Sequence, residues 1–363
     1  MKNTILLISI VLFLFSCSKS NENENLVPVD DKPTSQHKNI ILLIGDGMGL
    51  GQISGARTMN DEHLNMLRCT NVGLQATQAA DRYVTDSGAS GTAMSCGEKT
   101  NFYTVGVNVN ENPLTSILEL AEQNGLSTGL CVTSIINHAT PASFYAHNPD
   151  RFDYEGIALQ LISSEVDFFS GGGRDYFDNR SDGMNLIDSL IARDYQVVDN
   201  LSNITGNKKT AMFYADQHPP RYSNGRGDIL PNSVTVAINQ LQNNEKGFFL
   251  MVEGSQIDWA GEENDQDYLM EEMFDFDKAV GIALDFAKAD GQTLVIITGD
   301  HETGGFALLN GNQTNNTIVG DFVSLGHTGI MIPVFAYGPD SEKFCGVYEN
   351  TEIFYKMKGY FGF

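Results

Sequence analysis

The chain has 363 residues, which is enough for one large α/β domain or two smaller ones. It contains 22 lysines and arginines against 46 aspartates and glutamates, so its formal net charge is −24. Nucleic-acid binding needs a basic surface, and this balance therefore argues against a nucleic-acid partner. It also disfavours long-range attraction of an anionic substrate, so recognition of an anion has to come from local positive charge.

The first residues have the pattern of a targeting segment. Lys2 is followed by an apolar run from Ile5 to Phe15 and then by Ser16 and Cys17. The run is shorter than the roughly 20 apolar residues that span a bilayer. A cysteine directly after the cleavage point resembles a bacterial lipoprotein signal, in which that cysteine becomes lipid-modified. Ordinary secretion and an uncleaved anchor are the alternatives.

We therefore expect three parts in the chain: a signal peptide at 1–16, a flexible tether at 17–38 and one catalytic domain at 39–363. The tether is expected because its sequence is polar and poor in apolar residues. The protein is expected to be exported to the periplasm or cell surface and to be held on a bacterial membrane through Cys17.

Short apolar runs alternate with amphipathic segments in the remaining sequence, which is typical of an α/β fold. The expected strands are Asn39–Ile44, Val72–Thr77, Thr128–Thr133, Phe168–Gly171, Gly247–Val252, Thr293–Thr298 and Met331–Tyr337. The expected helices are Thr115–Asn124, Leu230–Gln242 and Tyr268–Ala289. Several strands are apolar throughout, which predicts a three-layer sandwich: a central, mostly parallel sheet with helices on both faces.

Metal-type ligands lie at the carboxyl ends of three predicted strands. Asp46 follows the first strand, Glu253 follows the fifth, and Asp300 and His301 follow the sixth. In an open α/β sheet, ligands bind outside the carboxyl ends of the strands. These side chains are therefore expected to meet at one edge of the sheet and to form a metal site.

Two short motifs have chemical meaning only in combination with others. Asp46 lies between Gly45 and Gly47, where the lack of bulky side chains lets a carboxylate approach a cation; alone, this is a tight turn. Asp86 and Ser87 precede a run of small residues, which indicates a helix start whose backbone N–H groups favour an anion such as phosphate. A plain N-cap is the alternative interpretation.

Further blocks follow in a fixed order: His138-Ala139-Thr140-Pro141-Ala142 with Arg151 downstream, Glu253-Gly254-Ser255-Gln256-Ile257-Asp258-Trp259, Gly299-Asp300-His301-Glu302-Thr303, and Gly326-His327-Thr328-Gly329. Together with the two motifs above, this set resembles the alkaline phosphatase family, in particular its compact cold-active bacterial members. The resemblance runs from about Asn39 to the C-terminus. It implies the alkaline phosphatase fold and the activity of a phosphomonoesterase.

The resemblance also implies a role for each matching residue. Ser87 would be the nucleophile and form a phosphoserine, and Arg151, oriented by Asp86, would clamp the phosphoryl oxygens. His138 and Trp259 would lie behind the ligands, at positions that vary within the family. Two Zn²⁺ and one Mg²⁺ would be bound as follows: Asp46, Asp300, His301 and the Ser87 hydroxyl on the first zinc, Asp258 and His327 on the second, and Asp46, Thr140 and Glu253 on the magnesium.

The chemistry of these residue types agrees with those roles. A serine hydroxyl is a poor nucleophile at neutral pH, and metal coordination is one way to activate it. Zinc accepts mixed histidine and carboxylate ligands, whereas magnesium prefers hard oxygen ligands. The planar guanidinium of arginine matches two phosphate oxygens.

Glu262 departs from the family pattern, which places a second histidine on the leaving-group zinc at this position. Three interpretations remain open. Glu262 could bind zinc itself, since carboxylate–zinc bonds are ordinary. The site could instead prefer a harder metal such as magnesium or manganese. Finally, it could stay empty, and the protein would then be a weak enzyme or a phosphate-binding lipoprotein.

Other enzyme classes share related folds and two-metal sites, so a phosphodiesterase or a sulfatase is an alternative. Sulfatases need a modified Cys or Ser in a Cys/Ser-x-Pro-x-Arg setting, which is absent around Ser87. Only a short segment separates His301 from His327, which implies that the large insertion of some family members is missing and the site is open. Small phosphate monoesters are the expected substrates, and a homodimer is the assembly usual in the family.

Some residues carry no motif of their own. The remaining histidines are expected to be structural or exposed: His37, His63, His147 and His218. Three arginines are candidates for contact with the substrate, although nothing in the sequence assigns them this role: Arg82, Arg174 and Arg226. Four cysteines contain no CxxC pair and are expected to be mostly buried apolar residues, with at most one disulfide of undefined pairing: Cys69, Cys96, Cys131 and Cys345.

Overall fold

The computed structural model describes residues 37–363, so the expected signal peptide and nearly all of the expected tether lie outside the described residues. A ten-stranded sheet forms the centre of this region. Its strands are β1 (Asn39–Gly45), β2 (Asn71–Ala76), β3 (Ser127–Ile135), β4 (Phe168–Gly172), β5 (Gln196–Val198), β6 (Thr210–Phe213), β7 (Phe248–Gly254), β8 (Thr293–Gly299), β13 (Ile332–Tyr337) and β14 (Gly346–Glu349).

The strand order is β14-β2-β13-β8-β1-β7-β3-β4-β6-β5. Every neighbouring pair is parallel except those that involve β13, which runs antiparallel to both β8 and β2. The predicted, mostly parallel sheet is therefore confirmed. All seven expected strands are present, and their observed ends differ from the expected ends by two residues or fewer. The short strands β5, β6 and β14 at the two ends of the sheet were not expected.

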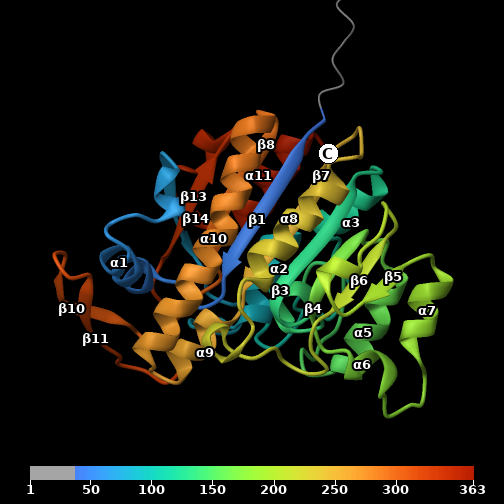
Figure 1. Cartoon of the computed structure of the whole chain (residues 1–363), viewed down its shortest axis with the longest axis horizontal. Helices are drawn as coiled ribbons and strands as arrows, with labels where there is room; N and C mark the ends of the chain where they lie inside the picture. The colour runs from blue at the N-terminus through green and yellow to red at the C-terminus, as the bar shows by residue number, and fades with distance from the viewer. Residues whose placement is uncertain (1–36) are drawn as a thin grey trace, which may run out of the picture. The chain divides into compact units, whose positions relative to one another are not determined.

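Helices cover both faces of the sheet, as expected (Figure 1). One face is covered by α2 (Ser87–Cys96), α3 (Ile117–Gln123), α5 (Tyr154–Ser163), α7 (Leu186–Ala192) and α11 (Thr351–Phe361). The other is covered by α1 (Leu50–Met59), α8 (Ile229–Leu241), α9 (Gln256–Glu262) and α10 (Gln266–Asp290). Two single-turn helices, α4 (Ala139–Ala142) and α6 (Asp175–Asp178), lie in the connections.

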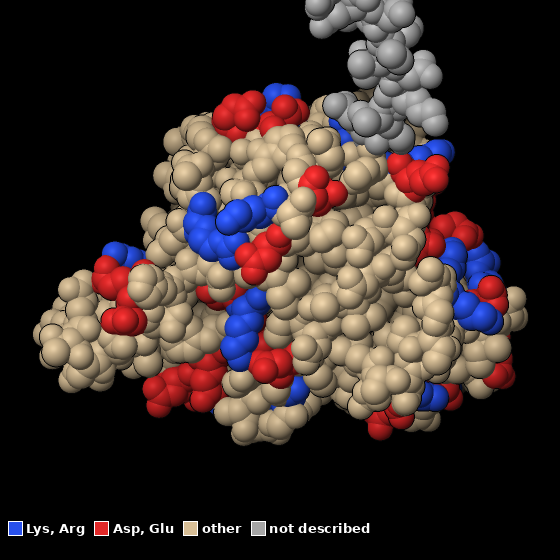
Figure 2. Space-filling model, turned by 45° about the horizontal axis from the view of Figure 1, so that its top comes forward, with Lys and Arg blue, Asp and Glu red and all other residues tan. Residues whose placement is uncertain are grey.

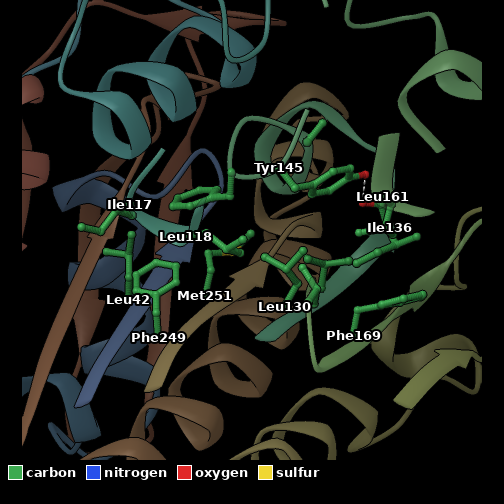
Figure 3. Close-up of a cluster of buried hydrophobic side chains, with 14 of the residues drawn as sticks. Leu42, Ile117, Leu118, Leu130, Ile136, Tyr145, Leu161, Phe169, Phe249 and Met251 are labelled. Carbon is green, nitrogen blue, oxygen red and sulfur yellow. Dashed lines mark hydrogen bonds between the residues drawn. The ribbon is translucent and has the colours of Figure 1, made fainter. Parts of the chain in front are cut away.

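The side chains of β1 show why the chain forms three layers. All seven residues of this strand are buried. Leu42 belongs to the core on one face, whereas Ile41 and Leu43 belong to the core on the other. In the first core, Leu42 lies with Phe249 of β7 and with Ile117 of α3 (Figure 3). Because successive side chains of a strand point to opposite faces, an apolar strand of this kind needs a helical layer on each side.

The segment between His301 and His327 is short in the structure too. It contains the hairpin β10 (Ala307–Asn312) and β11 (Thr317–Asp321), flanked by the two-residue strands β9 (Glu302–Thr303) and β12 (His327–Thr328). No helix between residues 37 and 363 has the length and apolar character needed to cross a membrane. The cysteines in this range are free thiols; three are buried, as expected, and Cys345 is exposed.

Charged side chains on the face shown in Figure 2 lie in small groups, in most of which basic and acidic residues are neighbours. Exposed ion pairs of the described region include Arg68 with Asp285 and Lys278 with Asp228. This face therefore carries no continuous basic surface.

Candidate active site

Three strands bring the candidate ligands together at the carboxyl edge of the sheet. β1 is paired in parallel with β7 on one side and with β8 on the other, and Gly45 is in register with both Gly254 and Gly299. Asp46, Glu253 and Asp300 therefore lie within one residue of a common level across adjacent strands. All three carboxylates are fully buried. The convergence expected from the sequence is confirmed.

The turn after β1 needs glycine at position 47. Gly47 has a φ of 77°, and a Cβ there would lie 2.7 Å from the Cα of Asp258 and 2.9 Å from the Thr303 hydroxyl. Only a residue without a side chain allows the backbone of Asp258 to lie so close to position 47. The backbone N–H of Gly47 also donates to Asp300 Oδ1 at 3.1 Å, which fixes that carboxylate.

Ser87 is the first residue of α2, as the sequence predicted. Asp86 is the N-cap, and its carboxylate accepts hydrogen bonds from the backbone N–H groups of Gly88 and Ala89. The Ser87 hydroxyl lies 3.5 Å from Asp46 Oδ2 and 3.4 Å from His301 Nε2. The nucleophile candidate thus stands at a helix N-terminus, where an anion is favoured, and beside two candidate metal ligands.

The described residues contain three groups of side chains whose ligand atoms lie within 4.8 Å of one another: Asp46 with Asp300 and His301, Asp258 with His301 and His327, and Asp46 with His138 and Glu253. The first is the ligand set that the family resemblance implies for the first zinc, and the second contains both residues implied for the second zinc, Asp258 and His327, and adds His301. The third contains two of the expected magnesium ligands and adds His138. Thr140, the remaining expected ligand, is fully buried on α4.

Unpartnered oxygen atoms show that this cluster suits divalent cations. Among the described residues, Asp46 Oδ1, Asp300 Oδ2, Glu253 Oε1 and Thr140 Oγ1 are buried and accept or donate no hydrogen bond. A buried carboxylate oxygen without a partner is costly, because burial removes it from water and nothing replaces the lost hydrogen bonds. Cations bound between these oxygens would remove that cost.

The proton affinities of the cluster lead to the same conclusion. Burial, with Asp258 beside it, raises the pKa of Asp300 to about 6, and burial raises that of Glu253 to about 7. Burial and the neighbouring carboxylates raise the pKa of Asp46 well above its usual value. Burial lowers the pKa of His301 and of His138, so both imidazoles are neutral and can accept a metal.

The two histidines of the cluster are held by neighbouring groups. The rings of His301 and His327 stack with centroids 3.6 Å apart and planes 18° from parallel. Nδ1 of His327 lies 2.8 Å from the backbone oxygen of Thr85, which leaves Nε2 facing Asp258 Oδ1 at 3.4 Å. Thr303 connects His301 with Asp258, because its hydroxyl lies 3.2 Å from His301 Nδ1 and donates to Asp258. Such partners fix the orientation of metal-binding rings.

Arg151 is placed for an anion at Ser87. Its Nη1 donates to Asp86 Oδ2 at 2.7 Å, and its backbone N–H donates to the Tyr103 oxygen at 2.9 Å. Burial opposes the charge, but Asp86 outweighs it and raises the pKa of Arg151. The Nε group is buried without a partner. A fixed guanidinium with a free donor beside a helix N-terminus is suited to phosphate oxygens.

A pocket of about 600 Å³ opens above Ser87. The expected site residues that line it are Asp86, Ser87, His138, Arg151, Asp258, Trp259, Glu262 and His327. Glu262 lies one turn of α9 after Asp258 and outside the three ligand groups of the described region. Burial and Asp258 raise the pKa of its carboxyl, and His327 and Arg151 lower it, so Glu262 lies within the electrostatic reach of the site.

His218 was expected to be structural or exposed, but its ring contacts two residues of the site. Its centroid lies 4.8 Å from the Trp259 ring and 5.7 Å from the His138 ring, both edge to face. His218 precedes two prolines in a connecting loop and has no motif. Arg82, Phe102, Tyr103 and Phe152 have no motif either, and these four residues line the pocket. Only the fold brings these five residues to the site.

The fold and the site together define a metal-binding hydrolase of the α/β class. Comparison with known proteins makes this more specific. The family model described as "Alkaline phosphatase" matches residues 37–320. Alkaline phosphatase 3 of Bacillus subtilis (strain 168) is 34% identical, over 87% of this chain and 87% of its own. Alkaline phosphatase of Escherichia coli (strain K12) is 32% identical, over 92% of this chain and 87% of its own. The chain belongs to the alkaline phosphatase family.

Solved structures agree with this assignment. The alkaline phosphatase from the Antarctic bacterium TAB5 is 43% identical and superposes with a TM-score of 0.85 over 90% of this chain and 98% of its own. A cold-active alkaline phosphatase from a Shewanella species is 31% identical and superposes with a TM-score of 0.83, covering 90% of this chain and 100% of its own. A TAB5 mutant in which a histidine is replaced by glutamate has Mg bound in its M3 site.

Proposed function

We propose that this chain hydrolyses phosphate monoesters through a phosphoserine on Ser87. The observation that carries this proposal is the position of the Ser87 hydroxyl, which lies within 3.5 Å of both Asp46 and His301 at the N-terminus of α2. Unpartnered carboxylate oxygens lie in the same cluster. A serine elsewhere on the protein surface would have neither the cation ligands nor the anion-binding helix end.

Two Zn²⁺ and one Mg²⁺ are the cations that we assign to the cluster. Asp46, Asp300 and His301 would hold the first zinc beside Ser87, and Asp258 and His327 the second. Asp46, Thr140 and Glu253 would hold the magnesium, with His138 close enough to join them. Bound cations supply positive charge that activates the serine hydroxyl and stabilises both the attacking and the leaving oxygen.

The protein's own groups position the reaction. Asp86 holds Arg151, whose free Nε would bind phosphoryl oxygens, and the N–H groups at the start of α2 face the same anion. The Ser87 oxygen attacks phosphorus, the ester P–O bond breaks, and the alcohol leaves with a proton. Water then attacks the phosphoserine, the Ser87 O–P bond breaks, and phosphate is released. Asp86 keeps the guanidinium in place through its hydrogen bond with Arg151 Nη1.

Glu262 is proposed as the third ligand beside Asp258 and His327. It lies four residues after Asp258 on α9, and this spacing places two side chains on one face of a helix. Replacement by alanine should lower the metal content per chain, measured by elemental mass spectrometry. Glu263→Ala, a change at the next exposed position, is the matched control. Equal metal content in both variants would exclude Glu262 as a ligand.

The N-terminal assignments remain proposals. We propose a signal peptide at 1–16, a tether at 17–38 before the catalytic domain at 39–363, and a lipid on Cys17 that holds the exported protein on a membrane. The supporting pattern is the apolar run followed by Ser16 and Cys17. Assembly as a homodimer is also proposed, and size-exclusion chromatography with light scattering tests it.

The test of the main proposal is the release of 4-nitrophenol from 4-nitrophenyl phosphate, from bis(4-nitrophenyl) phosphate and from 4-nitrophenyl sulfate, with defined zinc and magnesium. We expect turnover of the monoester, its loss in Ser87→Ala and its retention in Ser54→Ala, an exposed serine of α1. Mass spectrometry after an acid quench should find the phosphate on Ser87. Faster hydrolysis of the diester or the sulfate would assign the chain to those classes, and phosphate binding without turnover would make it a phosphate-binding protein.

A further inference from the structure

The pocket above Ser87 is larger than a phosphoryl group needs, and part of its wall has no role in phosphate chemistry. That part consists of Arg82, Phe102, Tyr103 and Phe152, which we call the aromatic wall. Its rings are in contact, since Phe102 and Tyr103 have centroids 4.0 Å apart and Tyr103 and Phe152 5.1 Å apart. Tyr103 is 45% exposed and Phe152 51% exposed, so both rings offer uncovered surface.

The aromatic wall is attached directly to the groups that bind the phosphoryl oxygens. The backbone N–H of Tyr103 donates to Asp86 Oδ1 at 3.1 Å, and the Tyr103 oxygen accepts from the backbone N–H of Arg151. Phe152 is the next residue after Arg151, and the Arg151 guanidinium lies 5.6 Å from the Phe152 ring. The rings therefore stand beside the phosphate position and line the same pocket that the alcohol of a bound ester would enter.

Tyr103 is retained in a backbone conformation that does not suit it. Its φ is 70°, in the left-handed region that glycine adopts freely and a bulky side chain rarely does. Such outliers persist where the surrounding contacts impose them and are concentrated at functional sites. Here the contacts with Asp86 and Arg151 impose the conformation, and the result is an aromatic ring directed to the pocket rather than a glycine.

Arg82 completes the wall with a planar cation. Its guanidinium lies 4.1 Å from the centre of the Phe102 ring. Asp81 accepts the backbone N–H of Phe102 at 2.9 Å and lies 4.0 Å from Arg82 Nε. A guanidinium stacked in this way keeps an outer face that can stack on another flat ring. A surface of three aromatic rings and one guanidinium is the chemistry that binds planar aromatic groups.

We infer that the aromatic wall is a subsite for the leaving group, and that this enzyme prefers phosphate monoesters whose alcohol carries a planar aromatic ring. Nucleoside monophosphates and phosphotyrosine share this chemistry. The inference rests on the proposed phosphatase function and adds substrate selectivity to it. An enzyme that recognised the phosphoryl group alone would not discriminate between an ester with such a ring and the same ester without it.

Adenosine 5′-monophosphate and ribose 5-phosphate form a matched pair, because both are esters of the same primary alcohol and only the first carries a base. We expect a higher kcat/KM for the first. Phe102→Ala and Phe152→Ala should each lower the ratio of the two kcat/KM values by about 5-fold to 100-fold, the range found when a ring that stacks on a base is removed. Tyr355→Ala on α11 is the control, since its ring is 53% exposed and lies outside the pocket.

Phosphotyrosine and phosphoserine form a second pair and show which aromatic group the wall binds. If the variants lower the kcat/KM ratio for both pairs, the wall is a general aromatic subsite. If they lower it for one pair only, the wall is a subsite for the aromatic group of that pair. Ratios that are equal in the wild type and in all variants, for both pairs, overturn the inference. If no ester is hydrolysed, the proposed function fails instead. Calorimetric binding of adenosine 5′-monophosphate and of ribose 5-phosphate to the metal-loaded chain then tests the wall alone, and equal affinities overturn it.

Discussion

Removal of the metals should make this protein less stable as the pH rises. The pKa of Asp300 is raised to about 6 and that of Glu253 to about 7, in both cases chiefly by burial. In the unfolded chain both carboxyls titrate near pH 4. Between these values the folded, metal-free protein holds protons that the unfolded chain has already released. The stability is therefore complete below the unfolded pKa and is lost as the pH passes through the folded pKa.

The magnitude follows from the two shifts. Each folded pKa lies about two pH units above the ordinary value, and one unit corresponds to about 1.36 kcal/mol. Each carboxyl thus removes about 3 kcal/mol from the unfolding free energy as the pH rises from about 4 to about 7, and the part of this loss above pH 5.5 comes mainly from Glu253. The loss per carboxyl is a large part of the 5–15 kcal/mol that is typical of a folded protein, by a rough general scale. Bound cations take the place of the protons and abolish the loss.

Urea unfolding, followed by far-ultraviolet circular dichroism from pH 5.5 to pH 8.5, measures this effect in metal-free and metal-loaded protein. The difference in unfolding free energy between the two forms should widen with pH. Glu119 raises the pKa of His147, so this residue also lowers the unfolding free energy as the pH rises. Its contribution is the same in the metal-free and metal-loaded forms and cancels in their difference. Asp300→Asn should reduce the widening. A difference that stays constant or narrows as the pH rises would refute the reasoning.

Three further changes test other parts of the structure. Arg151→Lys keeps the charge but loses the planar fork, and we expect kcat/KM to fall about 10-fold to 100-fold, the effect of one charged hydrogen bond; wild-type kinetics would show that the fork is not needed. Arg226→Ala leaves the buried carboxylates of Glu272 and Asp275 without the guanidinium that pairs with them, so the unfolding free energy, measured by thermal or urea unfolding, should fall by about 3–5 kcal/mol. A decrease below about 1 kcal/mol would contradict this. Tyr103→Gly removes the strained conformation, so the unfolding free energy should stay level or rise by about 1 kcal/mol. The preference for aromatic esters should fall at the same time. A clear destabilisation would mean that the conformation carries no strain.

The sequence predicted those strands and helices whose local pattern of apolar residues matches their burial in the folded protein. The seven expected strands are mostly apolar runs buried in the sheet, and α10 keeps one apolar face along its whole length. By contrast, β5 has three partly exposed residues, and the residues of β14 are mostly exposed. β5 depends on pairing with β6, and β14 depends on pairing with β2. These are tertiary contacts, and the local sequence pattern does not predict them.

The site shows the same division. Asp46, Ser87 and Asp300 could be located because each lies at a strand end or helix start, and such positions are visible in the sequence. The aromatic wall could not be located, because its residues come from three connecting segments and share no pattern. Thr303 belongs to the motif after the sixth predicted strand, but no role was predicted for it, because its contacts with Asp258 and His301 depend on the fold.

The net charge of −24 restricts how such a site can bind an anion. Two arginines line the pocket, and Asp86 already neutralises Arg151. Asp258 and Glu262 face the same space, and the buried carboxylates of the cluster lie behind it. Without cations, the local charge would repel phosphate, and the carboxylates would hold protons instead. The same cations therefore have two physical effects: they stabilise a cluster that is costly when empty, and they reverse the sign of the field at Ser87.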